Sequence, residues 1–150
     1  MTRSDARRHA FTLVYQFPFF YEQTVEDLAH AKKWYYDGLE NDPDTTRPTD
    51  AHADYIDRVV WGVFDRLSHI DNVIENFLRG WDINRISKID LAIMRLAIYE
   101  MLCEADVSHG TAVNEAVEIA KEFGADESPS FVNGVLGNVS RSIQGRESLG

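Results

Sequence analysis

The sequence predicts an all-α fold, a helical bundle of roughly seven helices joined by short connections. Apolar residues recur at helical spacing through almost the whole 150-residue chain. The alternating runs rich in Val, Ile and Thr that are typical of strands are absent, and the only Asn-Gly pair lies within a helical pattern. The length fits one domain, and 44% hydrophobic residues are enough to form a core.

The first helix is expected to start near Ser4 or Asp5, because either side chain can cap a helix. Pro18 should end or kink this helix, since proline lacks a backbone donor and clashes with the preceding turn. The apolar face of the helix comprises Ala6, Ala10, Leu13 and Phe17.

Three more helices are expected before residue 80. The second covers about residues 25–39, and the acidic segment 37–50, which holds two prolines, predicts a loop. The third helix starts near Ala51. The fourth starts at Asp71 and closes at Gly80. The buried face of the third helix is expected to comprise Tyr55, Val59, Gly62, Val63 and Leu67.

Residues 83–103 are the most apolar stretch of the chain and predict a central helix with neighbours on several sides. Cys103 is the only cysteine, so no internal disulfide can form, and its apolar surroundings predict a small buried side chain.

Three charged residues, Asp90, Arg95 and Glu100, interrupt this apolar helix. A charge in such a helix must reach water or a partner, because an unpaired buried charge is costly. Two interpretations stay open. The side chains form internal ion pairs or extend to water, or they form an exposed stripe that docks another protein, with Asp90 facing a basic side chain.

Residues 111–141 predict two packed helices. Ser108 or His109 starts the first of them, and Gly124 ends it in a left-handed conformation. Ser128 is expected to cap the last helix, with Pro129 at its first position. Phe123 and Phe131 flank this joint, where they either fill the core or offer a platform for an unstacked base.

Composition and motifs argue against several functions. The histidines and the single cysteine lack metal-ligand spacing, and no phosphate-binding glycine loop occurs, so we expect no metal, no cofactor and no enzymatic activity. No stretch reaches the ~18 apolar residues of a membrane span. A cytoplasmic protein with no membrane partner is therefore expected.

The charge balance restricts nucleic-acid binding. A formal net charge of -10 repels phosphate, so RNA binding would need a local basic patch or a basic partner. The densest positive cluster comprises Arg3, Arg7 and Arg8 near the N-terminus. This cluster is either a solvated face or an edge that holds phosphate.

Three segments, in the same order, resemble the NusB family of bacterial transcription antitermination factors. They are ARRHAFTLVYQF, RISKIDLAIMRLAIYEML and AVNEAVEIAKEFGADESPSFVNGVLGNVSR. The last segment is the most specific, because it is close to a family signature. The resemblance covers most of the chain but not residues 19–50.

The resemblance implies two packed three-helix subdomains, expected here as helical halves of about residues 1–80 and 81–145 within one domain, 1–150. It implies a factor of the transcription elongation complex that pairs with ribosomal protein NusE and binds single-stranded boxA RNA in rRNA transcription. The RNA-binding positions it implies are Arg3, Arg7, Arg8, Glu127, Ser130 and Phe131. The partner-binding positions it implies are Asp90, Arg95 and Glu100.

Two departures from the family pattern predict weak RNA binding without the partner. Ser4 and Asp5 interrupt the basic run at the N-terminus, and Ser130 stands where the family often has lysine. Two other functions stay open: a helical protein-interaction scaffold without RNA binding, and a stand-alone relative of the N-terminal domain of an RNA cytosine methyltransferase. A homodimer is also left open by the sequence.

Overall fold

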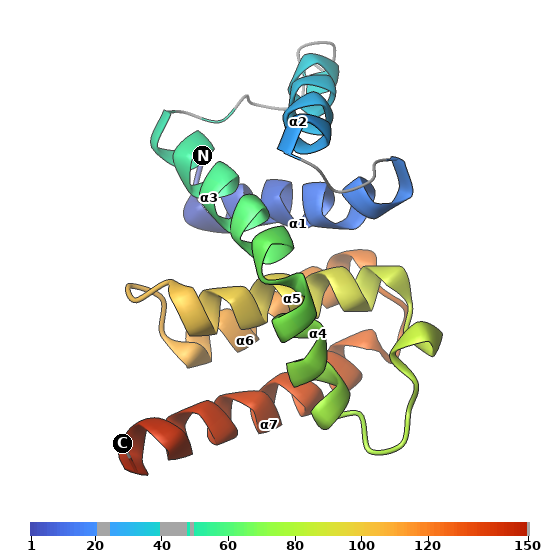
Figure 1. Ribbon diagram of the computed structural model, residues 1–150, viewed down its shortest axis with the longest axis vertical. Helices are drawn as coiled ribbons and strands as arrows, with labels where there is room; N and C mark the ends of the chain where they lie inside the picture. The colour runs from blue at the N-terminus through green and yellow to red at the C-terminus, as the bar shows by residue number, and fades with distance from the viewer. Residues whose placement is uncertain (21–24, 40–47, 49, 150) are drawn as a thin grey trace. The chain divides into compact units, whose positions relative to one another are not determined.

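The structure is a computed structural model that describes residues 1–20, 25–39, 48 and 50–149. These residues form seven α-helices and one 3₁₀ helix, with no strand among them, which confirms the all-α prediction (Figure 1). The helices are α1 Arg3–Phe20, α2 Val25–Leu39, α3 Asp50–Asp65, α4 Leu67–Asn76, η1 Ile83–Arg85, α5 Lys88–Cys103, α6 His109–Phe123 and α7 Ser128–Leu149. Within the described residues, no helix is long and apolar enough to cross a membrane.

The chain divides into two compact units, Met1–Asp65 and Arg66–Gly150. Unit 1 contains α1, α2 and α3, and unit 2 contains α4 to α7 together with η1. The sequence placed the division near residue 80. It falls earlier because α4 packs against α5 and α7 and therefore belongs to unit 2.

The start of α1 is fixed by a residue that the sequence did not single out. The Asp5 N–H donates to Thr2 Oγ1 and the Thr2 N–H donates to Asp5 Oδ2, each over 3.1 Å. This reciprocal pair is a capping box, so Thr2 is the cap in place of Ser4 or Asp5. The helix also continues past Pro18 to Phe20, where the sequence expected an end or a kink.

The core of unit 1 forms where α1 packs against α2 and α3. The residues 25–39 expected for the second helix match α2, and Lys32 Nζ of α2 lies 2.8 Å from Asp57 Oδ1 of α3. The predicted side-chain position of Phe17 and most of the predicted 37–50 loop lie outside the described parts of the chain. The buried apolar residues are Ala6, Ala10, Phe11, Leu13 and Val14 of α1, Ala31 of α2, and Tyr55, Ile56, Val59, Val60 and Val63 of α3.

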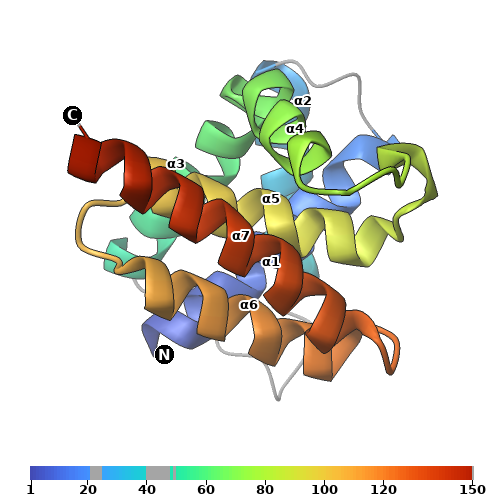
Figure 2. The same cartoon turned by 90° about the horizontal axis from the view of Figure 1, so that it is seen from below.

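Unit 2 is built around α5, which packs against α4, α6 and α7 and is buried from Asp90 to Met101 except at Arg95 (Figure 2). This confirms the predicted central helix. The apolar stretch is interrupted, however, because η1 precedes a new helix start at Ser87, whose Oγ accepts the Asp90 N–H over 3.1 Å. Cys103 is exposed at the end of α5, so the expectation of a buried thiol was wrong.

Other boundaries of unit 2 agree with the sequence prediction at the start of α6 and differ from it at both ends of α4. The sequence left Ser108 and His109 open as the start of α6. Ser108 is the cap, since its Oγ accepts the Thr111 N–H over 3.1 Å, and the helix begins at His109. The fourth helix begins at Leu67, before Asp71, and ends at Asn76, before Gly80. Leu67 itself opens α4 instead of completing the buried face of α3.

Candidate functional site

The predicted arginine edge lies at the start of α1 in unit 1. The Thr2 backbone and side-chain hydrogen bonds, in that order, hold the pKa of Asp5 below its ordinary value, and the charge of Arg8 adds to this. Asp5 is therefore ionised, and Arg8 Nη1 lies 3.9 Å from Asp5 Oδ1. The Asp5 that interrupts the basic run thus partly neutralises Arg8.

Arg3 and Arg7 turn toward the ring of Tyr55 in α3. The Cζ atoms of Arg3 and Arg7 lie 4.4 and 6.0 Å from the ring centroid, and Arg58 of α3 lies 5.9 Å from it. Guanidinium groups at these distances are attracted by the negative face of the ring. We call Arg3, Arg7 and Arg58 the Tyr55 arginine cluster. It concentrates three positive charges on one aromatic residue of an acidic chain.

Exposure differs sharply among the arginines. Arg7 is only 3% exposed, whereas Arg3 and Arg8 are partly exposed and Arg58 is exposed. The burial of Arg7 could not be predicted from the sequence, because it depends on the packing of α1 against α3, which is distant in the sequence. Arg58 was missed, although its place three residues after Tyr55 puts both side chains on one face of α3.

The second predicted region is the α6–α7 joint, residues 124–127. Gly124 has φ -89°, so the predicted left-handed stop was wrong. Glycine is needed there for space: a Cβ at residue 124 would lie 2.6 Å from Ser128 Cβ and 2.8 Å from the Ala120 carbonyl oxygen. The joint is therefore drawn tightly against the first turn of α7.

Ser128 holds this joint from inside and does not cap α7 in the predicted way. Its Oγ accepts the Ala125 N–H over 3.0 Å, and its side chain is buried. The helix instead starts with the Phe131 N–H donating to the Glu127 carbonyl oxygen over 3.1 Å. Glu127 and Ser130 are exposed and Phe131 is partly exposed, so the three predicted residues are accessible beside the joint.

The three charged residues of α5 do not form an exposed stripe in this chain. Arg95 Nε and Nη2 donate to Asp71 Oδ1 and Oδ2 of α4, each over 2.9 Å, which is the internal ion pair that the sequence left open. Glu100 is 1% exposed and Asp90 is 8% exposed. Asp90 Oδ1 is buried and has no hydrogen-bond partner among the described residues.

The described residues contain no group of three or more His, Cys, Asp or Glu side chains that could hold a metal ion. The arrangement offers a different chemistry. It provides guanidinium groups in unit 1, a partly exposed Phe131 beside the joint in unit 2, and the carboxylate of Asp90. These are groups that bind phosphate, a base and a basic side chain.

Comparison with known sequences gives a consistent result. The model of the NusB family matches residues 4–141. The chain is 43% identical to the transcription antitermination protein NusB of Acetivibrio thermocellus over 139 residues, covering 93% of this chain and 88% of that protein. It is 40% identical to the protein of the same name from Agathobacter rectalis, covering 91% of this chain and 97% of that protein.

Comparison with solved structures agrees. The structure of NusB from T. maritima matches with a TM-score of 0.77 and 29% identity, covering 94% of this chain and 92% of that chain. A chain in the crystal structure of antitermination factors NusB and NusE in complex with dsRNA shares the fold, with a TM-score of 0.73 and 22% identity over 93% of this chain and 96% of that chain. Because the family model matches residues 4–141 and the two relatives are 43% and 40% identical over most of the chain, the chain belongs to the NusB family.

Proposed function

We propose that this chain is a transcription antitermination factor that binds boxA RNA together with ribosomal protein NusE during rRNA transcription, without catalysing a reaction. The observation that carries the proposal is the identity of 43% and 40%, over more than 90% of this chain, to two proteins that are themselves named transcription antitermination proteins. The fold shared with a chain from a complex of NusB, NusE and dsRNA supports the choice of partners. This role would place the protein in the cytoplasm.

Phosphate binding is assigned to Arg3 and Arg8, with Arg58 as a further contributor. These residues are at least partly exposed, and the Cζ atoms of Arg3 and Arg58 lie 4.4 and 5.9 Å from the centroid of the Tyr55 ring. Arg7 is buried, so its contribution is to support Tyr55 and the positive potential around it. Because the whole chain carries a formal net charge of -10, Arg3, Arg8 and Arg58 alone would bind RNA weakly.

Base recognition is assigned to the α6–α7 joint. Phe131 offers a partly exposed aromatic face, and Glu127 and Ser130 offer exposed hydrogen-bonding groups next to it. Single-stranded RNA is recognised by stacking on aromatic side chains and by hydrogen bonds to base edges. The tight Gly124–Ser128 contact would keep these groups in place before RNA binds.

NusE binding is assigned to the α5 surface around Asp90. Asp90 keeps 8% of its surface exposed, and a lysine or arginine of a basic partner would pair with its carboxylate there. Arg95 would act through Asp71, because the ion pair orients α5 against α4. Glu100 would contribute from within the helix, since almost none of its surface is accessible.

The proposed function is tested with fluorescein-labelled single-stranded boxA RNA by fluorescence anisotropy. The expected result is weak binding by the chain alone, weak binding by NusE alone and at least tenfold tighter binding by the mixture. If the mixture bound no more tightly than NusE alone, the antitermination role would be refuted and the scaffold function would remain.

The partner contact is tested separately by calorimetry of NusE binding. Asp90→Asn preserves the shape of the side chain and removes its charge, so it is expected to weaken NusE binding. Asp54→Asn removes the same charge from an exposed position of α3 and serves as the matched control. Equal affinities for wild type and Asp90→Asn would rule out this contact.

A further inference from the structure

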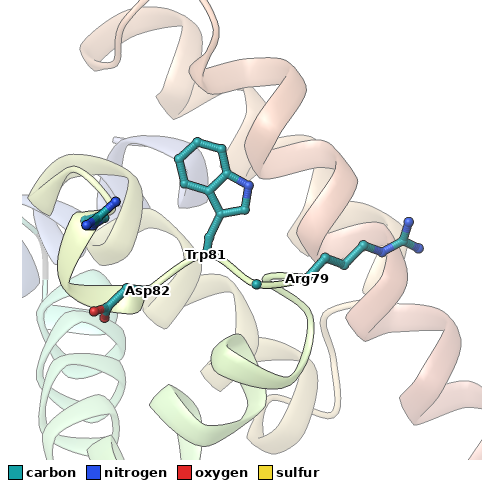
Figure 3. A pocket seen from close by; sticks show the side chains of 5 residues that line it. Arg79, Trp81 and Asp82 are labelled. Carbon is teal, nitrogen blue, oxygen red and sulfur yellow. The ribbon is translucent and has the colours of Figure 1, made fainter.

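The connection between α4 and α5 forms a pocket whose residues have no role in the RNA and NusE contacts proposed above. The pocket has a volume of about 540 Å3 and is lined by Arg79, Gly80, Trp81, Asp82 and Arg85 (Figure 3). All five residues belong to unit 2. We call this pocket the Trp81 pocket.

An exposed indole is the main feature of this pocket. Trp81 is 66% exposed, and Figure 3 shows its ring extending away from the connection, while Arg79 extends in another direction. Tryptophan offers a large apolar face, and leaving that face in water forgoes the stabilisation that burial would give. The fold therefore leaves an unused stacking surface at this point.

The two arginines of the pocket have no internal partner. Arg79 and Arg85 are exposed, and neither guanidinium group forms an ion pair or hydrogen bond with any residue that the structure describes. Arg95 of the same unit, in contrast, forms an ion pair with Asp71. The pocket thus presents two guanidinium groups whose charge stays available to an anion.

Backbone geometry fixes the way these side chains are presented. Arg79 has φ 50° and is the only non-glycine residue with positive φ among those described, and Gly80 follows with φ 90°. Such conformations cost about 1–3 kcal/mol for a non-glycine residue and concentrate at functional sites. The Asp82 carboxylate accepts the Asn84 N–H over 2.9 Å, so it caps η1 instead of pairing with an arginine.

The topology of unit 2 brings the pocket to the same end as the α6–α7 joint. The helices α5, α6 and α7 pack in sequence with short connections, so α6 runs back along α5 and α7 returns. The start of α5 and the start of α7 therefore lie at one end of the unit, as Figures 1 and 2 both show. A single-stranded RNA bound at Phe131 could therefore extend to the Trp81 pocket.

We propose that the Trp81 pocket binds one nucleotide of a single-stranded RNA. The base stacks on the Trp81 indole, and the flanking phosphates contact Arg79 and Arg85. This proposal rests on the RNA-binding function proposed above and adds a subsite to it. Chemistry favours RNA over a protein segment, because unpaired guanidinium groups beside an open aromatic ring match a phosphate–base–phosphate unit.

The first test compares variants in the presence of NusE, using the labelled boxA RNA. Trp81→Ala is expected to weaken binding about tenfold, which is within the range for one lost base–aromatic stack. Trp81→Phe should restore most of this loss, because a phenyl ring still stacks. Trp34→Ala, at a tryptophan of α2 with 67% exposure, is the matched control and should bind as wild type does.

Salt dependence tests the phosphate contacts. Arg79→Ala and Arg85→Ala should each lower the slope of log K against log salt concentration by about 0.7, the value for one phosphate contact to single-stranded nucleic acid. Lys33→Ala removes one charge from an exposed position in α2 and should leave the slope unchanged. Unchanged slopes for both arginine variants would overturn the phosphate assignment.

Tryptophan fluorescence separates the possible outcomes. The chain has three tryptophans, so the Trp34→Phe/Trp61→Phe variant reports on Trp81 alone. Quenching by RNA supports the subsite. Quenching or an emission shift with NusE alone would make this a protein contact and overturn the proposal. RNA binding by wild type that Trp81→Ala leaves unchanged defeats the subsite only, whereas no binding by wild type with NusE defeats the proposed function as well.

Discussion

The guanidinium group of Arg95 in α5 donates two hydrogen bonds of 2.9 Å to the carboxylate of Asp71 in α4. Both side chains are largely buried, at 14% and 25% exposure, so the pair is shielded from most of the solvent. It joins the first and the central helix of unit 2. The charge that seemed available on α5 is thus used to hold the unit together.

Asp71→Asn is expected to destabilise the protein by about 1–3 kcal/mol, because it removes the charge from two hydrogen bonds and leaves Arg95 without a counter-ion. Urea unfolding measures this effect. Glu118→Gln breaks an exposed pair with Lys121 at 3.0 Å and is the matched control, with an expected loss of about 0–1 kcal/mol. Equal losses in the two variants would contradict the structural role of Arg95.

Gly124→Ala is expected to destabilise the α6–α7 joint. The added methyl group would meet Ser128 and the Ala120 carbonyl oxygen at 2.6–2.8 Å, and overpacking of this kind costs about 1–3 kcal/mol. Gly134→Ala in α7 meets no atom within 4 Å and should stabilise the helix by about 0.5–1 kcal/mol. Thermal melts of both variants check the opposite signs, and a neutral Gly124→Ala would show that the joint can relax.

The free energy of unfolding is expected to decrease as the pH falls, because His9 is partly buried and becomes protonated. Burial lowers the pKa of the His9 side chain below its usual value, and the negative charge of Asp5 opposes this shift. His9 Nδ1 is hydrogen-bonded to the hydroxyl of Tyr35. Burial also raises the pKa of Tyr35, to about 12. The folded state favours the neutral ring. The stability that the neutral His9 ring contributes is fully present above its unfolded-state pKa of about 6.5. This stability is lost as the pH falls through the lower pKa of the folded state.

The free energy of unfolding in urea at pH 7.5 and pH 5.5 tests this contribution of His9. Wild type is expected to lose more stability over this interval than His9→Gln, which has no ring to protonate. Other groups titrate in the same interval, so the difference between the two proteins is the quantity that matters. Identical losses would show that the burial of His9 does not shift its titration.

Arg7→Ala should mainly affect folding. The side chain is 3% exposed and its guanidinium lies 6.0 Å from the Tyr55 ring, so its removal is expected to cost about 1–3 kcal/mol. Arg8→Ala, at a partly exposed site with an ion-pair distance of 3.9 Å, should cost about 0–1 kcal/mol. Chemical unfolding of both variants decides this. If Arg7→Ala were as stable as Arg8→Ala, Arg7 would not belong to the core of unit 1.

Local patterns in the sequence were enough to predict the helices. The periodic apolar residues located α2 and α5, and Ser108 capped α6 as its position before a helical pattern indicated. Contacts between distant residues were not accessible in the same way. The burial of Arg7 depends on the packing of α1 against α3, and the ion pair of Arg95 depends on Asp71 in another helix.

Turn residues show the same limit. Gly124 was correctly marked as special, but the reason is its close approach to Ser128 and not a left-handed backbone. Ser128 looked like a helix cap, yet its hydroxyl accepts a hydrogen bond from Ala125 inside the joint. Trp81 and its two arginines were passed over, because no periodic pattern distinguishes an exposed tryptophan in a connection from a buried one.

The central claim is that an acidic protein holds RNA through a few accessible arginines together with the cations of its partner. The most direct measurement is the salt dependence of boxA RNA binding by the NusE mixture, with wild type and with Arg3→Ala/Arg8→Ala. The expected result is a slope of log K against log salt concentration that falls by about 0.7 for each arginine removed. A variant with the same slope and the same affinity as wild type would contradict the claim.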